Sequence, residues 1–248
     1  MITSETSVYF LEYLRLELAR DEETGINHWA ATFDRAREAL RYSECQALLA
    51  GAKSMGGLHG EAQAIVWHCQ ANWLRQLSNW DEAVERYERS LRAFRAAGNK
   101  LGEGQVLSDL GNVYQAIGNW QRAAECYTQA LPLKRQYALP QDLASTINNL
   151  AVAQADLGEP AQALETLAEA LAIYRQHKAE AALGQALINR GNFLVRLGQL
   201  ESARAAYEES LHLLTVSNNR WDLPSAWNGL GNVRRHLVEL SEAAEMYQ

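Results

Sequence analysis

The sequence is poor in cysteine, proline and glycine, and each shortage excludes a class of structure. The three cysteines, Cys45, Cys69 and Cys126, are odd in number, widely spaced and set in helical patterns, so they do not describe a disulfide framework. They indicate a reducing, cytoplasmic setting. Glycine and proline, with 16 and 4 residues, make up about 8% of the chain against a usual value of roughly 12%. Few turn residues, together with abundant Ala, Leu, Glu, Gln and Arg, favour helix over sheet.

Long hydrophobic runs and an excess of positive charge are also missing. The N-terminal segment has no basic leader, and Glu12, Arg15 and Glu17 interrupt its apolar stretch, which argues against a signal peptide. Because no apolar window approaches the length of a transmembrane helix, we expect no membrane partner. The 23 Lys and Arg against 30 Asp and Glu give a net charge of −7, which argues against nucleic acid as a partner. An apolar fraction of 48% predicts a folded core.

A ten-residue pattern recurs along the chain in steps of 40 residues. It reads GNWQRAAECY from Gly118, and it returns as SNWDEAVERY from Ser78, GEPAQALETL from Gly158, GQLESARAAY from Gly198 and VELSEAAEMY from Val238. Upstream of each copy lies a second recurring segment: QANWL from Gln70, LGNVY from Leu110, LAVAQ from Leu150, RGNFL from Arg190 and LGNVR from Leu230. Apolar residues fall at helical spacing in both segments. Each repeat therefore predicts a hairpin of two helices.

Small residues recur inside both predicted helices of the hairpin. The first helix carries Ala71, Gly111, Ala151, Gly191 and Gly231, and the second carries Ala83, Ala123, Ala163, Ala203 and Ala243. A glycine inside a helix costs about 1 kcal/mol relative to alanine, so we interpret these positions as sites of close helix approach. The aromatic residue four positions later, Tyr87, Tyr127, Tyr207 or Tyr247, is expected to pack beside them, with Leu167 in its place in the third repeat. Pro132 predicts a kink or an early end to its helix.

This pattern resembles the tetratricopeptide repeat, in which a large residue, Leu-Gly, an aromatic, then Ala, an aromatic and Ala recur through two antiparallel helices. The second repeat matches best, at Leu107, Leu110, Gly111, Tyr114, Ala123, Tyr127 and Ala130. The resemblance implies an all-α fold, a right-handed α-α superhelix of about five to six helical hairpins. The step of 40 residues exceeds the family's usual length of roughly 34. It is similar to the long-repeat branch found in kinesin light chains and in bacterial signalling arrays.

The repeats divide the chain into two predicted regions. Residues 1–60 are less regular, and we expect a helical cap with a degenerate repeat, on stripes of Val8, Leu11, Leu14 and Leu18 and of Trp29, Phe33 and Leu40. The segment Ser54 to Glu61 predicts a helix stop rather than a phosphate loop. Residues 61–248 form the repeat array, whose last repeat is incomplete. Because an unfinished repeat exposes an apolar face, we expect the sequence to be part of a longer chain, with end-to-end self-association possible through that face.

The resemblance also implies where a ligand binds, because first helices of such arrays line a concave groove. The family's ligand-facing rows then hold Asn148 and Asn228 in one row and Asn72, Asn112, Asn192 and Asn232 in the next, with Asn149 and Asn189 adjacent. An asparagine amide offers a donor and an acceptor to the main chain of a peptide. One turn further lie Arg75, Gln115, Arg196 and Arg235, where arginine favours acidic groups.

Two interpretations of these residues remain open. The asparagines either bind a ligand or form hydrogen bonds that hold the helices together, since asparagine is a poor helix former and needs a partner. The arginines are either ligand contacts or ordinary surface residues. Loss of binding without loss of stability distinguishes a ligand contact from a structural one.

The sequence gives little support to an enzyme. Its six histidines show no metal-ligand spacing, no phosphate-binding or dinucleotide fingerprint is present, and helical cysteines are commonly buried and unreactive. We therefore expect no catalytic residue, metal or cofactor. The leading hypothesis is a non-enzymatic scaffold whose groove holds a protein or peptide segment. The alternative is a sensor or regulatory segment of a larger bacterial signalling protein, with a nucleotide-binding switch or protease-like effector elsewhere. RNA binding would require a basic groove.

Overall fold

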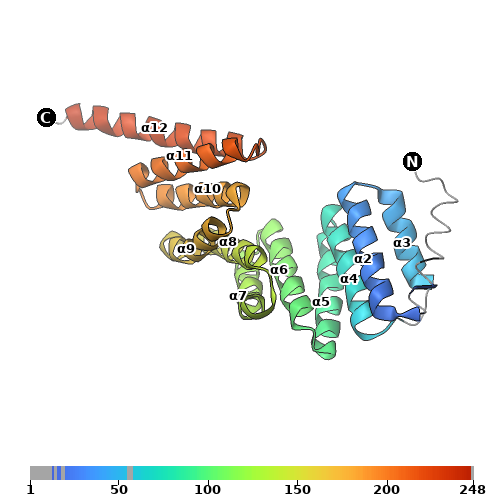
Figure 1. Cartoon of the computed structure of the whole chain (residues 1–248). Coiled ribbons are helices and arrows are strands. Elements are labelled where there is room, and N and C mark those ends of the chain that lie inside the picture. Colours follow the sequence, from blue (N-terminus) through green and yellow to red (C-terminus); the bar gives the residue numbers. More distant parts are fainter. Residues whose placement is uncertain (1–12, 14–15, 18–19, 55–57, 247–248) are drawn as a thin grey trace. The chain divides into compact units, whose positions relative to one another are not determined.

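The computed structural model describes residues 13, 16–17, 20–54 and 58–246, and the regular elements in this part are all α-helices. In chain order they are α2 (Glu22–Glu38), α3 (Tyr42–Ser54), α4 (Gly60–Gln76), α5 (Trp80–Ala97), α6 (Lys100–Ala116), α7 (Trp120–Tyr137), α8 (Pro140–Asp156), α9 (Pro160–Gln176), α10 (Glu180–Arg196), α11 (Leu200–Val216) and α12 (Leu223–Met246) (Figure 1). The predicted all-α fold of helical hairpins is confirmed. The predicted stripe of Val8, Leu11, Leu14 and Leu18 lies outside the described residues.

The chain forms two compact units, Met1–Val113 and Tyr114–Gln248, with the boundary inside α6. In the first unit α2 packs against α3 and α4, and α4 forms a hairpin with α5. The stacked rings of Trp29 and Phe33 are fully buried at the centre of this core, as the sequence predicts. Leu40 is not part of that stripe: it is 57% exposed, because it lies in the turn between α2 and α3 with a φ of 55°.

The second unit is a run of helices in which each one packs against the next, from α7 to α12. Figure 1 shows α10, α11 and α12 side by side. Buried hydrogen bonds join the two helices within a hairpin: Ser210 on α11 donates its hydroxyl hydrogen to the carbonyl of Gly184 on α10 at 2.7 Å. Ser90 and Ala64 make the same bond between α5 and α4 in the first unit, at 2.8 Å. Two of the hairpins therefore share this hydrogen bond, whereas Ala130 and Ala170 occupy the equivalent positions of the two hairpins between them.

The turns inside the hairpins depend on residues that accept a positive φ. Gly118, Gly158 and Gly198 adopt φ values of 77°, 91° and 72°, which are costly for side chains larger than glycine's. The next position in the 40-residue step is Val238, and there α12 continues as an unbroken helix to Met246. The expected hairpin turn at Val238 is therefore absent, because a β-branched residue disfavours the left-handed conformation that such a turn needs.

Pro132 does not end its helix, so the early end, one of the two outcomes expected from sequence, is wrong. Helix α7 runs from Trp120 to Tyr137 with Pro132 inside it. A proline removes the hydrogen bond to the carbonyl four residues earlier, here that of Thr128. Both residues are exposed, so water can reach the free carbonyl, and the helix tolerates the proline at this position.

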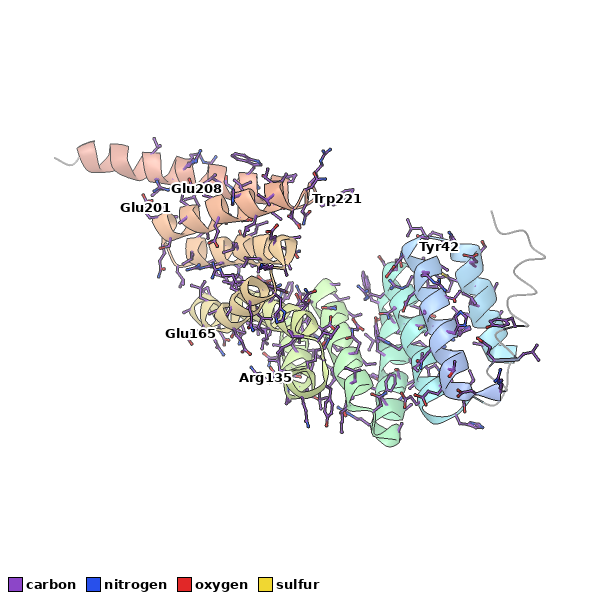
Figure 2. All side chains as sticks on the ribbon, viewed as in Figure 1. Tyr42, Arg135, Glu165, Glu201, Glu208 and Trp221 are labelled. Atoms are coloured by element: carbon purple, nitrogen blue, oxygen red, sulfur yellow. The ribbon has the colours of Figure 1, made fainter. Side chains whose placement is uncertain are left out.

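Charged side chains on successive second helices form ion pairs on the surface of the second unit. Arg135 on α7 pairs with Glu169 on α9 at 2.8 Å, and Arg175 on α9 pairs with Glu209 on α11 at 2.8 Å. All four side chains are about half exposed, so each pair adds little stability. Figure 2 shows side chains projecting from these helices, including the labelled Arg135 and Glu165. The second helices are thus rich in charged residues because these side chains lie on the surface, in contact with water.

Candidate functional site

A pocket of about 460 Å³ lies on α10, α11 and α12 of the second unit. Its lining includes four of the predicted site residues, Asn192, Arg196, Asn228 and Asn232. The remaining lining residues are Ile188, Val195, Tyr207, Ser225 and Gly229. The structure therefore brings together asparagines from two successive first helices, α10 and α12, around a common cavity.

Tyr207 of α11 forms part of the pocket lining and links the two first helices. Its ring lies so close to Gly191 on α10 and Gly229 on α12 that a Cβ atom at either glycine would lie within 2.4–2.6 Å of a ring carbon. Both glycines are therefore required for the packing of this ring. Tyr207 is 2% exposed, and burial raises the pKa of its phenol, so the hydroxyl stays protonated and can donate a hydrogen bond.

The hydroxyl of Tyr207 donates to Oδ1 of Asn192 at 2.7 Å, and this bond sets the orientation of the amide. Because Oδ1 accepts from tyrosine, the NH2 group of Asn192 is left to donate, and it has no partner within the described part of the chain. Asn228 makes no hydrogen bond to any described residue. Asn232 accepts from Nη2 of Arg235 at 3.3 Å. The pocket is thus surrounded by amide donors that are available to a ligand.

Arg196 is held at the edge of this pocket by contacts to the preceding hairpin. Its Nη1 donates to the carbonyl oxygen of Ala155 at 2.5 Å, and its Nη2 pairs with Asp156 at 2.7 Å. The guanidinium is about half exposed, while Asp156 is more buried. Arg196 therefore ties α10 to the end of α8, and the Asp156 carboxylate already balances its charge.

A second cluster of predicted residues connects α8 and α10. Nδ2 of Asn148 donates to Oδ1 of Asn149 at 3.2 Å, and Nδ2 of Asn189 donates to Oδ1 of Asn148 at 3.0 Å. All three side chains are half-buried. Asparagines about one repeat apart are therefore hydrogen-bonded to each other here.

In the first unit, Asn72 belongs to a network of four side chains. Its Oδ1 accepts from the hydroxyl of Tyr87 at 2.6 Å, and its Nδ2 lies 3.5 Å from Nε2 of His68. The same His68 nitrogen is 2.8 Å from Oδ2 of Asp109. Burial disfavours the charge of Asp109, but hydrogen bonds from His68 and Gln105 and the positive charges of His68 and Arg75 outweigh it and lower the pKa of the carboxyl group.

The other predicted residues lie in separate environments. Oε1 of Gln115 accepts from the hydroxyl of Tyr127 at 2.9 Å. Arg75 is half-buried, and its Nε is shielded from water without a hydrogen-bond partner among the described residues. Asn112 is half-buried on α6.

Sequence reasoning missed the role of Tyr207 and Ser225 in the pocket and the pairing of His68 with Asp109. A signal for the pair existed, because Asp109 is the one acidic residue in the stretch Gln105 to Ile117 and lies one repeat step plus one residue after His68. A sequence signal existed for Tyr207 as well. Gly191 precedes Tyr207 by 16 positions, and Gly111 precedes Tyr127 by the same interval.

The described residues show little that would support covalent or metal chemistry. They contain no group of three or more His, Cys, Asp or Glu side chains placed to hold a metal ion. All three cysteines are free thiols, and burial raises the pKa of Cys126 to about 11, so its thiol stays protonated at neutral pH. None of the helices in the described ranges is long and apolar enough to cross a membrane.

Comparison with known protein families agrees with this repeat geometry. Family profiles described as tetratricopeptide repeat match residues 62–136, 143–177 and 184–213, which together exceed half of the chain. The chain belongs to the tetratricopeptide repeat family. Comparison with curated proteins gives no significant match.

Solved structures of several proteins superpose on most of the chain. BtubC from P. vanneervenii is 19% identical with a TM-score of 0.73, covering 86% of this chain and 90% of its own. A Rap protein complexed with Competence and Sporulation Factor is 17% identical with a TM-score of 0.68, covering 95% and 68%. A signal transduction ATPase with a tetratricopeptide repeat sensor from Pyrococcus horikoshii is 18% identical with a TM-score of 0.69, covering 93% and 39%. At these identities the similarity shows the fold.

Proposed function

We propose that this tetratricopeptide protein is a non-enzymatic scaffold that binds an extended segment of a partner protein in the pocket on α10, α11 and α12. The observation that carries the proposal is the set of asparagine amides around that pocket. Asn192 and Asn228 have NH2 groups with no partner among the described residues. Main-chain carbonyls of an extended peptide are suitable acceptors for such donors.

The arrangement favours a main-chain contact over the recognition of a charged ligand. Arg196 is already paired with Asp156, and the rest of the lining is formed by neutral side chains and Gly229. Ile188 and Val195 supply an apolar surface for a ligand side chain next to the amides. A pocket of this kind holds a peptide through its backbone and selects for a small or apolar side chain.

The preset orientation of Asn192 supports the same function. The buried Tyr207 hydroxyl fixes Oδ1 as the acceptor, so the amide does not have to be ordered when the ligand arrives. The neighbouring cluster of Asn148, Asn149 and Asn189 is bonded internally, so it supports the helices that carry the pocket. The asparagines thus have different roles, with ligand binding assigned to the pocket on α10, α11 and α12.

A second candidate is a sensor segment that passes the binding event to an effector. The observation that favours it is the fold similarity to the sensor-containing ATPase of Pyrococcus horikoshii, of which this chain covers 39%, and to the Rap protein complexed with Competence and Sporulation Factor. In that case the same pocket binds the signal. Sequencing the natural gene beyond the codon for Gln248 tests it: an attached effector domain supports a sensor, and a stop codon contradicts it.

The binding proposal is tested by selecting peptides from a display library against the 248-residue protein and titrating them calorimetrically. Asn192→Asp keeps an oxygen for Tyr207 but replaces the donor with an acceptor, and Asn228→Ala removes an amide that makes no hydrogen bond to described residues. Each substitution should weaken binding about tenfold, which corresponds to about 1.4 kcal/mol. Gln162→Ala, which removes an exposed amide from α9, is the matched control. Equal affinity of both pocket variants and the control would contradict the proposal.

A further inference from the structure

The outer face of α12 is uncovered in a way that the corresponding face of α10 is not. On α10, Gly184, Leu187, Gly191 and Leu194 are all buried. A Cβ added at Gly184 would contact Leu214 of α11, and one at Gly191 would contact Tyr207, so the second helix of the hairpin covers this stripe. The residues 40 positions later on α12 are Pro224, Trp227, Gly231 and Arg234, and all four are exposed, although Arg234 at the edge of this face pairs with Glu208 of α11 at 3.1 Å.

Gly231 and Trp227 show most directly that this face lacks a partner helix. A Cβ at Gly191 would lie 2.6 Å from the ring of Tyr207, whereas one at Gly231 would meet nothing within 4 Å. Trp227 is 58% exposed, although Leu187 at the equivalent position of α10 is fully buried. The α12 face thus keeps the small residue that receives an aromatic ring, and no ring of a described residue covers it. Its opposite side is occupied, since Leu230 and Val233 are buried and Asn228 and Asn232 line the ligand pocket.

The sequence that follows the uncovered face has the small and aromatic residues of a second helix at the expected spacing. In the hairpin of α10 and α11, Ala203 and Tyr207 follow Gly191 by 12 and 16 residues, and Ala243 and Tyr247 follow Gly231 by the same intervals. The turn that would fold this segment back is missing, because Val238 occupies the place of Gly198 and α12 runs on as a helix of 24 residues. A straight helix cannot cover its own face.

From these contacts we propose that α12 pairs antiparallel with α12 of a second copy of this chain. In each copy, the segment of α12 after Val238 packs on Trp227 and Gly231 of the partner copy. This packing corresponds to that of α11 on Leu187 and Gly191 of α10. Each copy covers the other, so the interface is two-fold symmetric and closed. The dimer interface therefore reproduces the contact between the two helices of a hairpin. This contact forms between two chains because α12 continues as a helix where the hairpin turn would be. The ligand pocket on the other side of α12 remains open in this dimer.

Sedimentation velocity of the 248-residue chain over a concentration series tests the pairing. The wild type should sediment as a dimer with twice the chain mass of 27.7 kDa and dissociate on dilution. Gly231→Leu should be a folded monomer, since the added side chain meets no described neighbour within its own chain but occupies the space that the partner helix would fill. Ala205→Leu adds bulk at an exposed position of α11 and should remain dimeric. A wild type that stays monomeric at its solubility limit, or a Gly231→Leu variant that stays dimeric, would overturn the proposal.

A second variant tests the role of the straight helix independently. Val238→Gly restores the residue type found at Gly118, Gly158 and Gly198, so the segment after it can fold back on its own α12. This variant should be a monomer whose total tryptophan emission is blue-shifted relative to that of Gly231→Leu, because Trp227, one of the seven tryptophans, is covered within one chain. A variant that remains dimeric contradicts the exchange. So does a monomer in which Trp227 stays as exposed as in Gly231→Leu.

Discussion

The hydroxyl of Tyr207 donates a hydrogen bond of 2.7 Å to Oδ1 of Asn192, and this contact joins the packing of the hairpin to the candidate binding site. Tyr87 and Asn72 form the equivalent contact in the first unit, at 2.6 Å. In both pairs the tyrosine on the second helix follows the asparagine on the first by 15 residues. The buried ring stabilises the hairpin, and its polar end orients a residue on the opposite helix.

We predict that Tyr207→Phe separates these two roles. The ring keeps its packing against Gly191 and Gly229, so the protein should lose only about 0.5–1.5 kcal/mol of unfolding free energy for the missing hydrogen bond. The loss of binding free energy for the peptide should exceed this loss of unfolding free energy, because the Asn192 amide is no longer fixed. Chemical denaturation and calorimetric titration measure the two effects. Tyr87→Phe is the matched control, since it removes the same bond in the other unit and should leave peptide affinity unchanged.

Gly191→Ala and Gly231→Ala should change stability in opposite directions. At Gly191 the new methyl group would lie 2.6 Å from the ring of Tyr207, and such overpacking costs about 1–3 kcal/mol. At Gly231 it meets no neighbour, so the higher helix propensity of alanine should stabilise α12 by up to about 1 kcal/mol. Thermal melts of the two variants at a protein concentration low enough to populate monomers measure this difference. A destabilised Gly231→Ala monomer would show that the α12 face is covered within its own chain.

The lowered pKa of Asp109 predicts a pH-dependent contribution to stability. A carboxyl group whose pKa is lower in the folded than in the unfolded state stabilises the fold above its ordinary pKa of 3.8, and this contribution is lost as the pH falls through the folded value. Asp109→Asn should therefore be less stable than the wild type at pH 7, and the difference should shrink as the pH falls below 3.8. Melting curves of both proteins across this range test the prediction. A difference that stays constant would show that the pairing with His68 does not depend on the carboxylate charge.

A substitution in the buried bonds between helices tests the repeated geometry itself. Ser210→Ala removes the donor to the Gly184 carbonyl, and Ser90→Ala removes the donor to the Ala64 carbonyl. Each variant should lose about 1 kcal/mol of unfolding free energy. Neither should affect peptide binding, because neither serine lines the pocket. Denaturant titrations of the two variants should give similar losses, whereas a large loss in one alone would show that the two bonds are not equivalent.

The regular part of the fold was predictable because the same physical requirements recur every 40 residues. Small residues at Ala83 and Gly191, buried tyrosines at Tyr87 and Tyr207, and helical spacing of apolar side chains all agree on hairpins of helices. The expected early helix end at Pro132 was wrong, because exposure of the freed carbonyl decides whether a proline ends a helix, and exposure depends on the packing. The sequence-based expectation was also wrong at Val238, because the match to the repeat pattern concealed the loss of the residue that the turn requires.

The candidate site was only partly predictable from sequence. The rows of asparagines follow from the repeat, but their different environments do not. Asn148 and Asn189 bond to each other, Asn72 joins a network with His68, and Asn192 and Asn228 face a pocket. These differences depend on the neighbouring residue at each step, such as Tyr207 or Asp109, and on the approach of helices that Gly229 permits. The 40-residue period predicts which residues share a face of the array. The hydrogen bonds of each side chain then determine which of these residues are available to bind a ligand.

The measurement that tests the central claim most directly is an NMR titration of the 15N-labelled protein with a selected peptide, observing the side-chain NH2 signals of the asparagines. The NH2 signals of Asn192 and Asn228 should shift downfield and saturate with the same dissociation constant as calorimetry gives, because these groups donate to peptide carbonyls. The signals of Asn148 and Asn189, which are bonded to each other, should move little. Unchanged signals of Asn192 and Asn228 at saturating peptide would contradict the assignment of this pocket as the binding site.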